Sequence, residues 1–224
     1  MAVITDDFQV KIPYEITEEY FIDEPLNAKK GVLYTFIKRC FDIVVAFFAL
    51  VVLFIPMVII GIIVAATSEG GALYKQERLG KNGKPFTMVK FRTMIKDSEI
   101  DGAQWSQGEY DPRITPIGKI LRNTRLDELP QLLCILTGKM SFVGPRPERE
   151  CFYNEFEKYI HGFKHRLLVT PGLTGHAQVN GGYELKPEEK IIYDIEYIEK
   201  RSIGMDIKIL FQTVAVVFGR KGAK

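Results

Sequence analysis

Residues 43–67 form an uncharged run of 25 residues, 17 of which are Leu, Ile, Val or Phe. Each of these favours membrane insertion by about 0.3–0.6 kcal/mol, so the run favours the bilayer by about 5–10 kcal/mol. The alternative, a buried core helix of a soluble domain, seldom lacks charge over such a length. The segment therefore predicts a membrane-associated chain.

Basic residues flank this run on both sides. They are Lys29, Lys30, Lys38 and Arg39 before it, and Lys75, Arg78, Lys81 and Lys84 after it. The positive-inside rule places such residues on one side of a spanning helix, so balanced flanks suit a segment that enters and leaves by the same membrane face. Pro56, near the middle, removes one helical hydrogen bond and favours a kink. A re-entrant segment and a kinked spanning helix both stay open, and Asp42 at the entrance is expected to be interfacial rather than catalytic.

Composition excludes several other classes of protein. The formal net charge is only +2, and no basic run interleaves with aromatic residues, so we expect no nucleic-acid partner. The three cysteines, Cys40, Cys134 and Cys151, are widely spaced, which suggests neither a disulfide framework nor a cysteine zinc site. A reducing, cytosol-facing location fits them best. The first thirty residues are polar and acidic, so no cleavable signal peptide is expected.

The rest of the chain predicts a mixed α/β domain that is mostly helical. Residues 87–94 have strand character, and a period of two places Lys90 and Arg92 on one face. That face either binds phosphate or is solvated. A loop is expected at 102–111, and tight turns at 171–175 and 180–182.

Three further helices are expected from capping and periodicity. Thr115 and Pro116 begin one that ends near Arg122 and buries Ile117, Ile120 and Leu121. Residues 186–201 form a charged helix with one apolar face, made of Ile191, Ile195 and Ile198. Residues 205–218 are apolar on most sides, which predicts a helix either in the core or in the headgroup region of a membrane.

Two adjacent carboxylates, Asp127 and Glu128, lie at the start of another expected helix, which buries Leu126, Leu129, Leu133 and Leu136. Pro130 places that start close to Asp127, because proline is tolerated only in the first turn. A helix N-terminus stabilises anions, which favours a deprotonated Asp127. A carboxylate near arginines suits attack on a phosphoryl centre, because the arginines neutralise the phosphate charge. The alternative is that Asp127 closes a capping box with Thr124.

Arg146 stands between Pro145 and Pro147, which should hold the backbone extended and stiff. A guanidinium held in this way can bind phosphate through two parallel hydrogen bonds with little loss of entropy. The alternative is a connector in which Arg146 caps the C-terminus of a neighbouring helix.

Several segments together resemble the bacterial monotopic phosphoglycosyl transferases, the sugar transferases that begin glycan assembly. The matching segments lie at 38–42, 89–94, 111–119, 127–132, 138–147 and 171–180, so the resemblance spans about residues 38–218. It implies transfer of a sugar-1-phosphate from a UDP-sugar to polyprenyl (undecaprenyl) phosphate, with release of UMP. It also implies an N-terminal tail (1–37), a re-entrant membrane helix-break-helix (38–68) and a catalytic domain (69–224) with interfacial helices. The chain would then act at the cytoplasmic face of the bacterial inner membrane.

The resemblance also implies roles for particular residues. Asp127 would be the nucleophile that forms an aspartyl-phosphosugar intermediate, and Glu128 would help to hold Mg²⁺. Lys90, Arg122 and Arg146 match basic positions that bind phosphate. Asp194 and Asp206 match acids near the C-terminus that are expected on the substrate side of the site.

Two positions depart from the family pattern. Ile55 stands where the family often has serine before the helix-breaking proline, and Gly182 stands where it often has arginine. Larger relatives carry several spanning helices before this domain, so the sequence resembles the minimal form. Two other functions stay open: an inactive membrane-tethered scaffold of the same fold, and a phosphatase with an aspartyl-phosphate intermediate, although no Asp-x-Asp motif follows a hydrophobic strand. The sequence does not determine the sugar, the glycan pathway or whether the chain forms a homo-oligomer.

Overall fold

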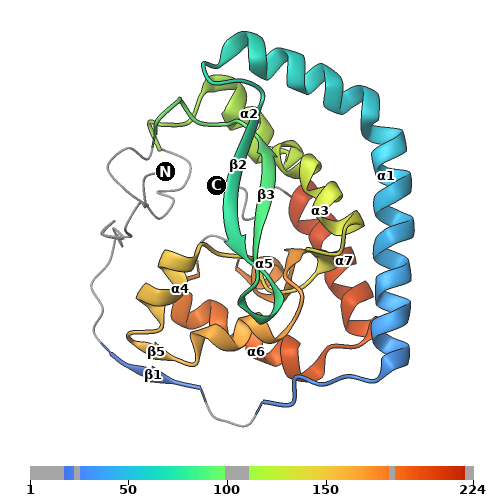
Figure 1. The fold of residues 1–224 in the computed structure, drawn as a ribbon, viewed down its shortest axis with the longest axis vertical. Coiled ribbons are helices and arrows are strands. Elements are labelled where there is room, and N and C mark those ends of the chain that lie inside the picture. Colours follow the sequence, from blue (N-terminus) through green and yellow to red (C-terminus); the bar gives the residue numbers. More distant parts are fainter. Residues whose placement is uncertain (1–17, 23–25, 99–110, 182–184, 220–224) are drawn as a thin grey trace, which may run out of the picture.

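The structure is a computed structural model that describes residues 18–22, 26–98, 111–181 and 185–219 (Figure 1). The loop expected at 102–111 lies outside these residues except for Asp111, and so does much of the expected tail. The predicted mixed, mostly helical α/β domain is confirmed. The elements in chain order are β1 (Tyr20–Phe21), α1 (Val32–Thr67), β2 (Leu73–Leu79), η1 (Lys81–Gly83), β3 (Pro85–Phe91), α2 (Pro116–Asn123), η3 (Leu126–Gln131), α3 (Leu132–Leu136), β4 (Ser141–Val143), α4 (Glu150–Phe156), β5 (Ile160–His161), η4 (Phe163–Leu168), β6 (Gly172–Thr174), α5 (His176–Asn180), α6 (Pro187–Lys200) and α7 (Ile203–Phe218).

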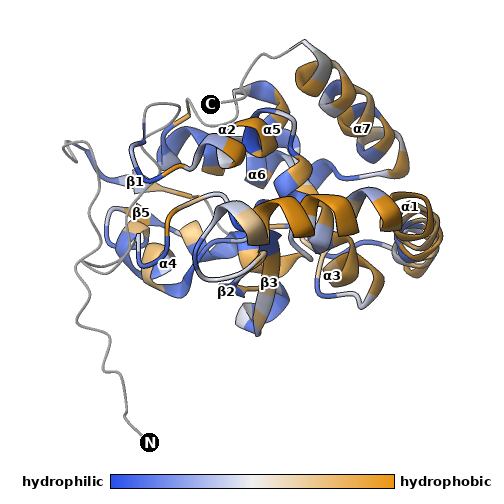
Figure 2. Cartoon of the chain, turned by 90° about the horizontal axis from the view of Figure 1, so that it is seen from above, coloured by the Kyte–Doolittle hydropathy of each residue, from blue (hydrophilic) through white to orange (hydrophobic). Residues whose placement is uncertain are grey.

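Helix α1 contains the whole uncharged run and begins before it, at Val32. It is one continuous helix of 36 residues with Pro56 inside it, and Figure 1 shows it following one edge of the molecule before bending across the top. By length and composition it could cross a membrane, and only 6% of its most apolar window is buried. Figure 2 shows its nearly continuous apolar character. The alternative of a buried core helix is therefore wrong.

The polar residues at the start of α1 bind it to three other elements. Lys38 Nζ lies 2.9 Å from Asp206 Oδ2 of α7. Arg39 donates to the carbonyls of residues 135 and 136 at the end of α3, both at 2.7 Å, where the helix leaves carbonyls without partners. Asp42 accepts hydrogen bonds from Ser141 Oγ (3.1 Å) and the Phe142 amide (3.0 Å). Asp42 is buried and joins α1 to β4.

Strands β2 and β3 form an antiparallel hairpin whose register runs from Leu73 opposite Phe91 to Leu79 opposite Pro85. The hairpin turns at Asn82 and Gly83, which have φ of 59° and 70°. Strand β3 ends at Phe91 instead of continuing to residue 94. The Arg92 guanidinium turns back to the carbonyls of Gly70 and Gly71 after α1, whereas Lys90 reaches the site described below.

Within the segment 171–175, where a tight turn was expected, residues 172–174 form the strand β6. β6 pairs in parallel with β4. A Cβ at Gly172 would lie 2.1 Å from the Gly144 nitrogen, and one at Gly175 would lie 2.2 Å from the Gly144 oxygen. The glycines of this motif therefore allow two backbones to approach closely. Gly182 lies outside the described residues.

Helices α2 and α6 follow the expected periodicity except at Ile120. Thr115 caps α2, with its Oγ1 accepting from the Gly118 amide at 3.0 Å, but Ile120 is 59% exposed and not buried. In α6 the expected apolar face is confirmed. Helix α7 contributes Ile209, which is only 1% exposed, to a hydrophobic core cluster. Its residues Ile207, Phe211 and Val214 are exposed, Phe211 by 73%, so the helix is buried on one face only.

The residues before α1 contact the domain that follows α1. β1 pairs in parallel with β5, and the Tyr20 amide donates to the Tyr159 carbonyl at 2.8 Å. Lys30 Nζ donates to the Glu199 carbonyl of α6 at 2.7 Å. Both flanks of α1 are thus held on one folded body.

Candidate active site

The two adjacent carboxylates lie in the first turn of η3, a short 3₁₀ helix between α2 and α3. Arg125, in the left-handed region with φ of 58°, separates η3 from α2. The Thr124 hydroxyl donates to the Ile120 carbonyl at 2.8 Å, so it finishes α2 and does not form a capping box with Asp127. The predicted helix N-terminus is confirmed, although the helix there is 3₁₀ and not α.

The tighter helix changes which side chains point inward. Asp127 is 6% exposed and Glu128 is 7% exposed. In α3 the buried residues are Leu132, Cys134 and Ile135, whereas Leu133 is half exposed. The expected buried face assumed one α-helical period from Leu126 to Leu136. That assumption fails because the first six residues form a 3₁₀ helix, with three residues per turn.

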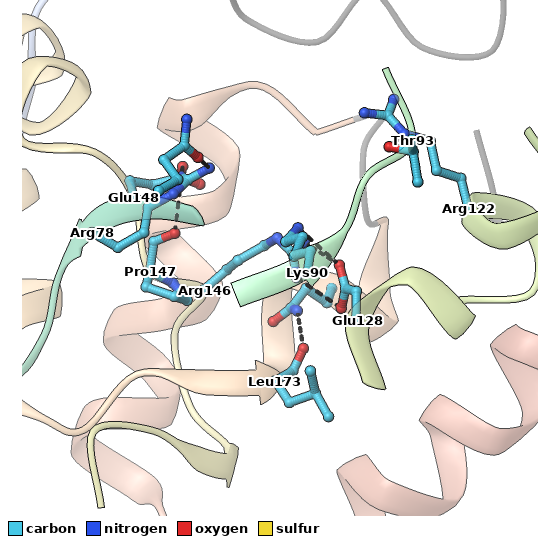
Figure 3. A network of polar contacts seen from close by, with 11 residues as sticks. Arg78, Lys90, Thr93, Arg122, Glu128, Arg146, Pro147, Glu148 and Leu173 are labelled. Carbon is cyan, nitrogen blue, oxygen red and sulfur yellow. Dashed lines mark hydrogen bonds and ion pairs between the residues drawn. The ribbon is translucent and has the colours of Figure 1, made fainter. Parts of the chain in front are cut away.

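Glu128 binds two cations from distant parts of the chain (Figure 3). Arg146 Nη2 lies 2.5 Å from Glu128 Oε1, and Arg146 Nη1 lies 3.5 Å from Oε2. Lys90 Nζ, from the end of β3, lies 3.4 Å from Oε1. We call Lys90, Glu128 and Arg146 the Glu128 cluster. The Arg146 guanidinium therefore faces a carboxylate.

Arg122 comes close to the site without joining the Glu128 cluster. Its Nε donates to Thr93 Oγ1 at 3.0 Å, and Figure 3 shows this pair apart from Arg146 and Glu128. Its positive charge nevertheless acts to lower the pKa of Asp127.

The two predicted C-terminal acids bind structural partners. Asp194 pairs with Arg166, with Nε and Oδ2 2.7 Å apart and both side chains buried. Asp206 accepts from Tyr34 (3.0 Å), Lys38 (2.9 Å) and Tyr197 (2.7 Å), which ties α7 to α1 and α6. The structure does not bring either acid into the Glu128 cluster.

The environments of Asp127 and Glu128 push their pKa values in opposite directions. Burial would raise the pKa of Glu128, but the charges of Arg146 and Lys90 outweigh it and hold this pKa far below its ordinary value. Burial raises the pKa of Asp127, and the negative charge of Glu128 raises it further, against the opposing charges of Lys90, Arg122 and Arg146. Burial thus works against the expected effect of the helix N-terminus on Asp127, and it is the larger influence on this pKa.

The donor set suits a divalent cation only in part. Mg²⁺ takes oxygen ligands and commonly uses one or two carboxylates together with substrate phosphates. Among the described residues, no group of three or more His, Cys, Asp or Glu side chains could hold a metal ion. The two carboxylates therefore fit a Mg²⁺ that arrives with a phosphate, and not one held by protein ligands alone.

Three supporting residues were not expected from the sequence. Arg78 pairs with Glu148 at 2.7 Å and donates to the Pro147 carbonyl at 3.2 Å (Figure 3). Arg166 and Thr93 contact the backbone of Arg146 and the side chain of Arg122, respectively. No local pattern marks these residues, because each acts on a segment distant in sequence.

Comparison with known proteins identifies the family. The model of the bacterial sugar transferase family matches residues 33–220. The chain is 39% identical, over 235 aligned residues, to the UDP-glucose:undecaprenyl-phosphate glucose-1-phosphate transferase of Escherichia coli (strain K12), covering 100% of this chain and 50% of that protein. It is 38% identical over 196 residues to the UDP-N-acetylgalactosamine-undecaprenyl-phosphate N-acetylgalactosaminephosphotransferase of Aeromonas hydrophila, covering 86% and 46%.

A shorter relative matches over more of its own length. The putative undecaprenyl-phosphate N-acetylgalactosaminyl 1-phosphate transferase of Bacillus subtilis (strain 168) is 45% identical over 140 residues, covering 62% of this chain and 78% of that protein. The chain spans about half the length of the Escherichia and Aeromonas proteins. With most of its residues matched by the family model, the chain belongs to the bacterial sugar transferase family.

Proposed function

We propose that this chain transfers a sugar-1-phosphate from a UDP-sugar to polyprenyl (undecaprenyl) phosphate and releases UMP. The observation that carries the proposal is the buried pair of carboxylates, Asp127 and Glu128, with Lys90 and Arg146 bound to Glu128. Two neighbouring acids whose environments separate their pKa values have different tasks. The names of the relatives, which specify undecaprenyl-phosphate transfer of several sugars, support this reaction class.

Asp127 makes the first attack. One of its carboxylate oxygens attacks the phosphorus that carries the sugar, an O–P bond forms, the P–O bond to the UMP phosphate breaks, and UMP leaves with the electron pair. A carboxylate with a raised pKa is more basic, and therefore more nucleophilic once it has lost its proton. Lys90 and Arg146 offset the negative charge that would otherwise repel an anionic nucleophile.

Polyprenyl phosphate makes the second attack. Its phosphate oxygen attacks the same phosphorus, the bond to Asp127 breaks, and the carboxylate is restored. Two steps avoid bringing two phosphates together without a screening cation, and UMP departs before the lipid arrives. The proposal therefore includes ping-pong kinetics and an aspartyl-phosphosugar intermediate.

Mg²⁺ belongs to the proposal as a partner of Glu128. Glu128 and the substrate phosphates would hold it, and when bound it supplies positive charge to the phosphoryl group. Glu128 is suited to this role because its lowered pKa keeps it ionised.

We further propose that α1 enters and leaves the membrane by one face. Residues on both sides of α1 contact the same domain: Tyr20 and Lys30 before it, and Arg92 after it. The balanced basic flanks agree with this topology. The domain would then lie at the cytoplasmic face of the bacterial inner membrane, where the reaction begins glycan assembly, such as that of an exopolysaccharide, a capsule or a glycoconjugate.

A panel of UDP-sugars with UMP as the readout tests the reaction. We expect the protein in membranes or detergent to release UMP from at least one UDP-sugar, and to turn over repeatedly only when polyprenyl phosphate is present. An inactive scaffold releases none. A phosphatase releases product without polyprenyl phosphate, so sustained turnover in its absence would replace this proposal.

A further inference from the structure

Arg166 and Asp194 form the most deeply buried ion pair of those described, with each side chain only 2% exposed. The Arg166 guanidinium also lies over the Phe163 ring (4.9 Å to the centroid) and the Tyr153 ring (5.8 Å). Removing two charges from water is costly, and apolar residues of similar volume often stabilise a core as well or better. Stability alone is therefore a weak reason for this pair.

A further donor of Arg166 points to a second role. Its Nη2 donates to the backbone carbonyl of Arg146 at 2.9 Å. The next carbonyl, at Pro147, accepts from Arg78 at 3.2 Å, and that of Glu148 accepts from the Leu79 amide at 3.0 Å. Three successive carbonyls are thus held while the Arg146 side chain extends to Glu128.

We infer that Arg166, oriented by Asp194, is a positioning residue that holds the Arg146 backbone so that its guanidinium meets the phosphate of the substrate. This inference rests on the proposed function of the same site. Asp194 then acts indirectly, by orienting Arg166, which in turn holds Arg146. It does not contact the phosphate. A fork of two parallel hydrogen bonds depends on orientation, so a displaced backbone costs rate even when the charge stays in place.

A double-mutant cycle tests the inference. Arg166→Lys keeps the charge beside Asp194 but lacks the planar fork that serves both Asp194 and the Arg146 carbonyl. We expect kcat/KM for UMP release to fall by no more than the loss in Arg146→Lys, about 10–100-fold and mainly in kcat. In the Arg146→Lys background, Arg166→Lys should cost little more, because the residue it positions has already lost its fork.

Arg39→Lys is the matched control. Arg39 also donates its guanidinium to backbone carbonyls, but those at the end of α3. The fold-loss in kcat/KM caused by Arg39→Lys should therefore be the same in the wild type and in the Arg146→Lys background. Unfolding curves are recorded for every variant, so rates are compared per folded molecule. If Arg166→Lys does not fold, the double variant Arg166→Met/Asp194→Leu replaces the ion pair with apolar residues of similar size, and the same non-additivity is expected.

UDP binding, measured by calorimetric titration, separates this inference from the proposed function. If the wild type binds UDP but releases no UMP from any UDP-sugar, the proposed function fails, and the cycle is read from UDP affinity. Positioning is supported, in either readout, if Arg166→Lys lowers the rate or the UDP affinity in the wild type but has little further effect in the Arg146→Lys protein. The inference is overturned if the effects of the two substitutions multiply independently, or if Arg166→Lys changes neither the rate nor the UDP affinity. It is also overturned if the wild type does not bind UDP.

Discussion

Arg146 and Glu128 face each other directly, with Nη2 of the arginine 2.5 Å from Oε1 of the glutamate. The arginine proposed to bind phosphate therefore already holds a carboxylate. An incoming phosphate must share or displace that partner, and displacement would release the Glu128 oxygens toward a cation that arrives with the substrate. Binding of substrate and organisation of the metal ligand would then be one event.

Arg146→Lys should lose most activity although the charge is kept. A lysine cannot form the two parallel hydrogen bonds, and a charge-assisted pair contributes about 1.5–3 kcal/mol, or about 10–100-fold in kcat/KM. UMP release measures the loss. Arg92→Lys is the control, because Arg92 binds backbone carbonyls after α1. Normal turnover by folded Arg146→Lys would assign Arg146 to structure.

Asp127 should become covalently modified. Incubation with Mg²⁺ and the UDP-sugar, without acceptor lipid, should add the mass of one sugar phosphate to the peptide that contains Asp127. Asp127→Asn should fold, because the amide removes a buried charge that burial disfavours, yet it should form no adduct and release no UMP. Mass spectrometry detects the adduct, and circular dichroism shows whether Asp127→Asn is folded. An active Asp127→Asn protein would require direct transfer between phosphates.

The raised pKa of Asp127 sets the direction of the pH dependence. A group whose pKa is raised holds its proton to higher pH, so the acid limb of kcat/KM should lie above the ordinary aspartate value of 3.8. Arg122 lowers this pKa, so Arg122→Met should move the limb to higher pH. Arg92→Met, which removes a cation not among those acting on Asp127, should leave it in place. A limb at or below 3.8 in the wild type would contradict the burial argument.

Both ends of α1 should be accessible from the cytoplasmic side. Cysteines at Asn27 and Glu69 test this in a background without Cys40, Cys134 and Cys151, using a membrane-impermeant maleimide on intact and opened cells. Glu69 is preferable to Gly70, because Gly70 has φ of +91° and packs against the Arg92 guanidinium. Both sites should label only in opened cells. Labelling of either site in intact cells would mean that α1 spans the membrane.

Pro56→Leu should straighten α1 and lower activity.

Asp42→Leu should destabilise the fold by about 1–3 kcal/mol, because the Ser141 hydroxyl and the Phe142 amide would lose their buried acceptor. Thermal unfolding in detergent measures the change. Glu69→Leu, an exposed acid at the other end of α1, should stay within about 0.5 kcal/mol of the wild type. Equal effects of the two substitutions would show that Asp42 does not anchor α1.

Local rules predicted much of this molecule. The apolar run, the Thr115 cap, the charged helix α6 and the position of the two carboxylates at a helix start all follow from nearby residues. The resemblance to a family implied that Lys90 and Arg146 bind phosphate, but their contact with Glu128 was not predicted, because the three residues come from separate elements.

The misplaced features each depended on contacts beyond the local sequence. Burial of the carboxylates works against the deprotonated state expected for Asp127, and β4 drew residues 172–174 into a strand where the glycines suggested a turn. The structural contacts of Asp42 were missed because its partners, Ser141 and Phe142, lie about a hundred residues away. Asp194 was expected at the substrate, and its contact with Arg166 places it behind Arg146 instead.

The pairing of β1 with β5 has a practical consequence for how this chain can be shortened or fused. Tyr20 and Phe21 complete a sheet with Ile160 and His161, and the Phe21 ring stacks on His161 at 4.5 Å. A truncated chain that starts at α1 would lack β1 and leave β5 without its partner strand. Figure 1 shows β1 at the opposite side of the domain from the start of α1. A tag joined just ahead of residue 18 would therefore emerge beside β5 and α4, leaving the membrane-facing helix unobstructed.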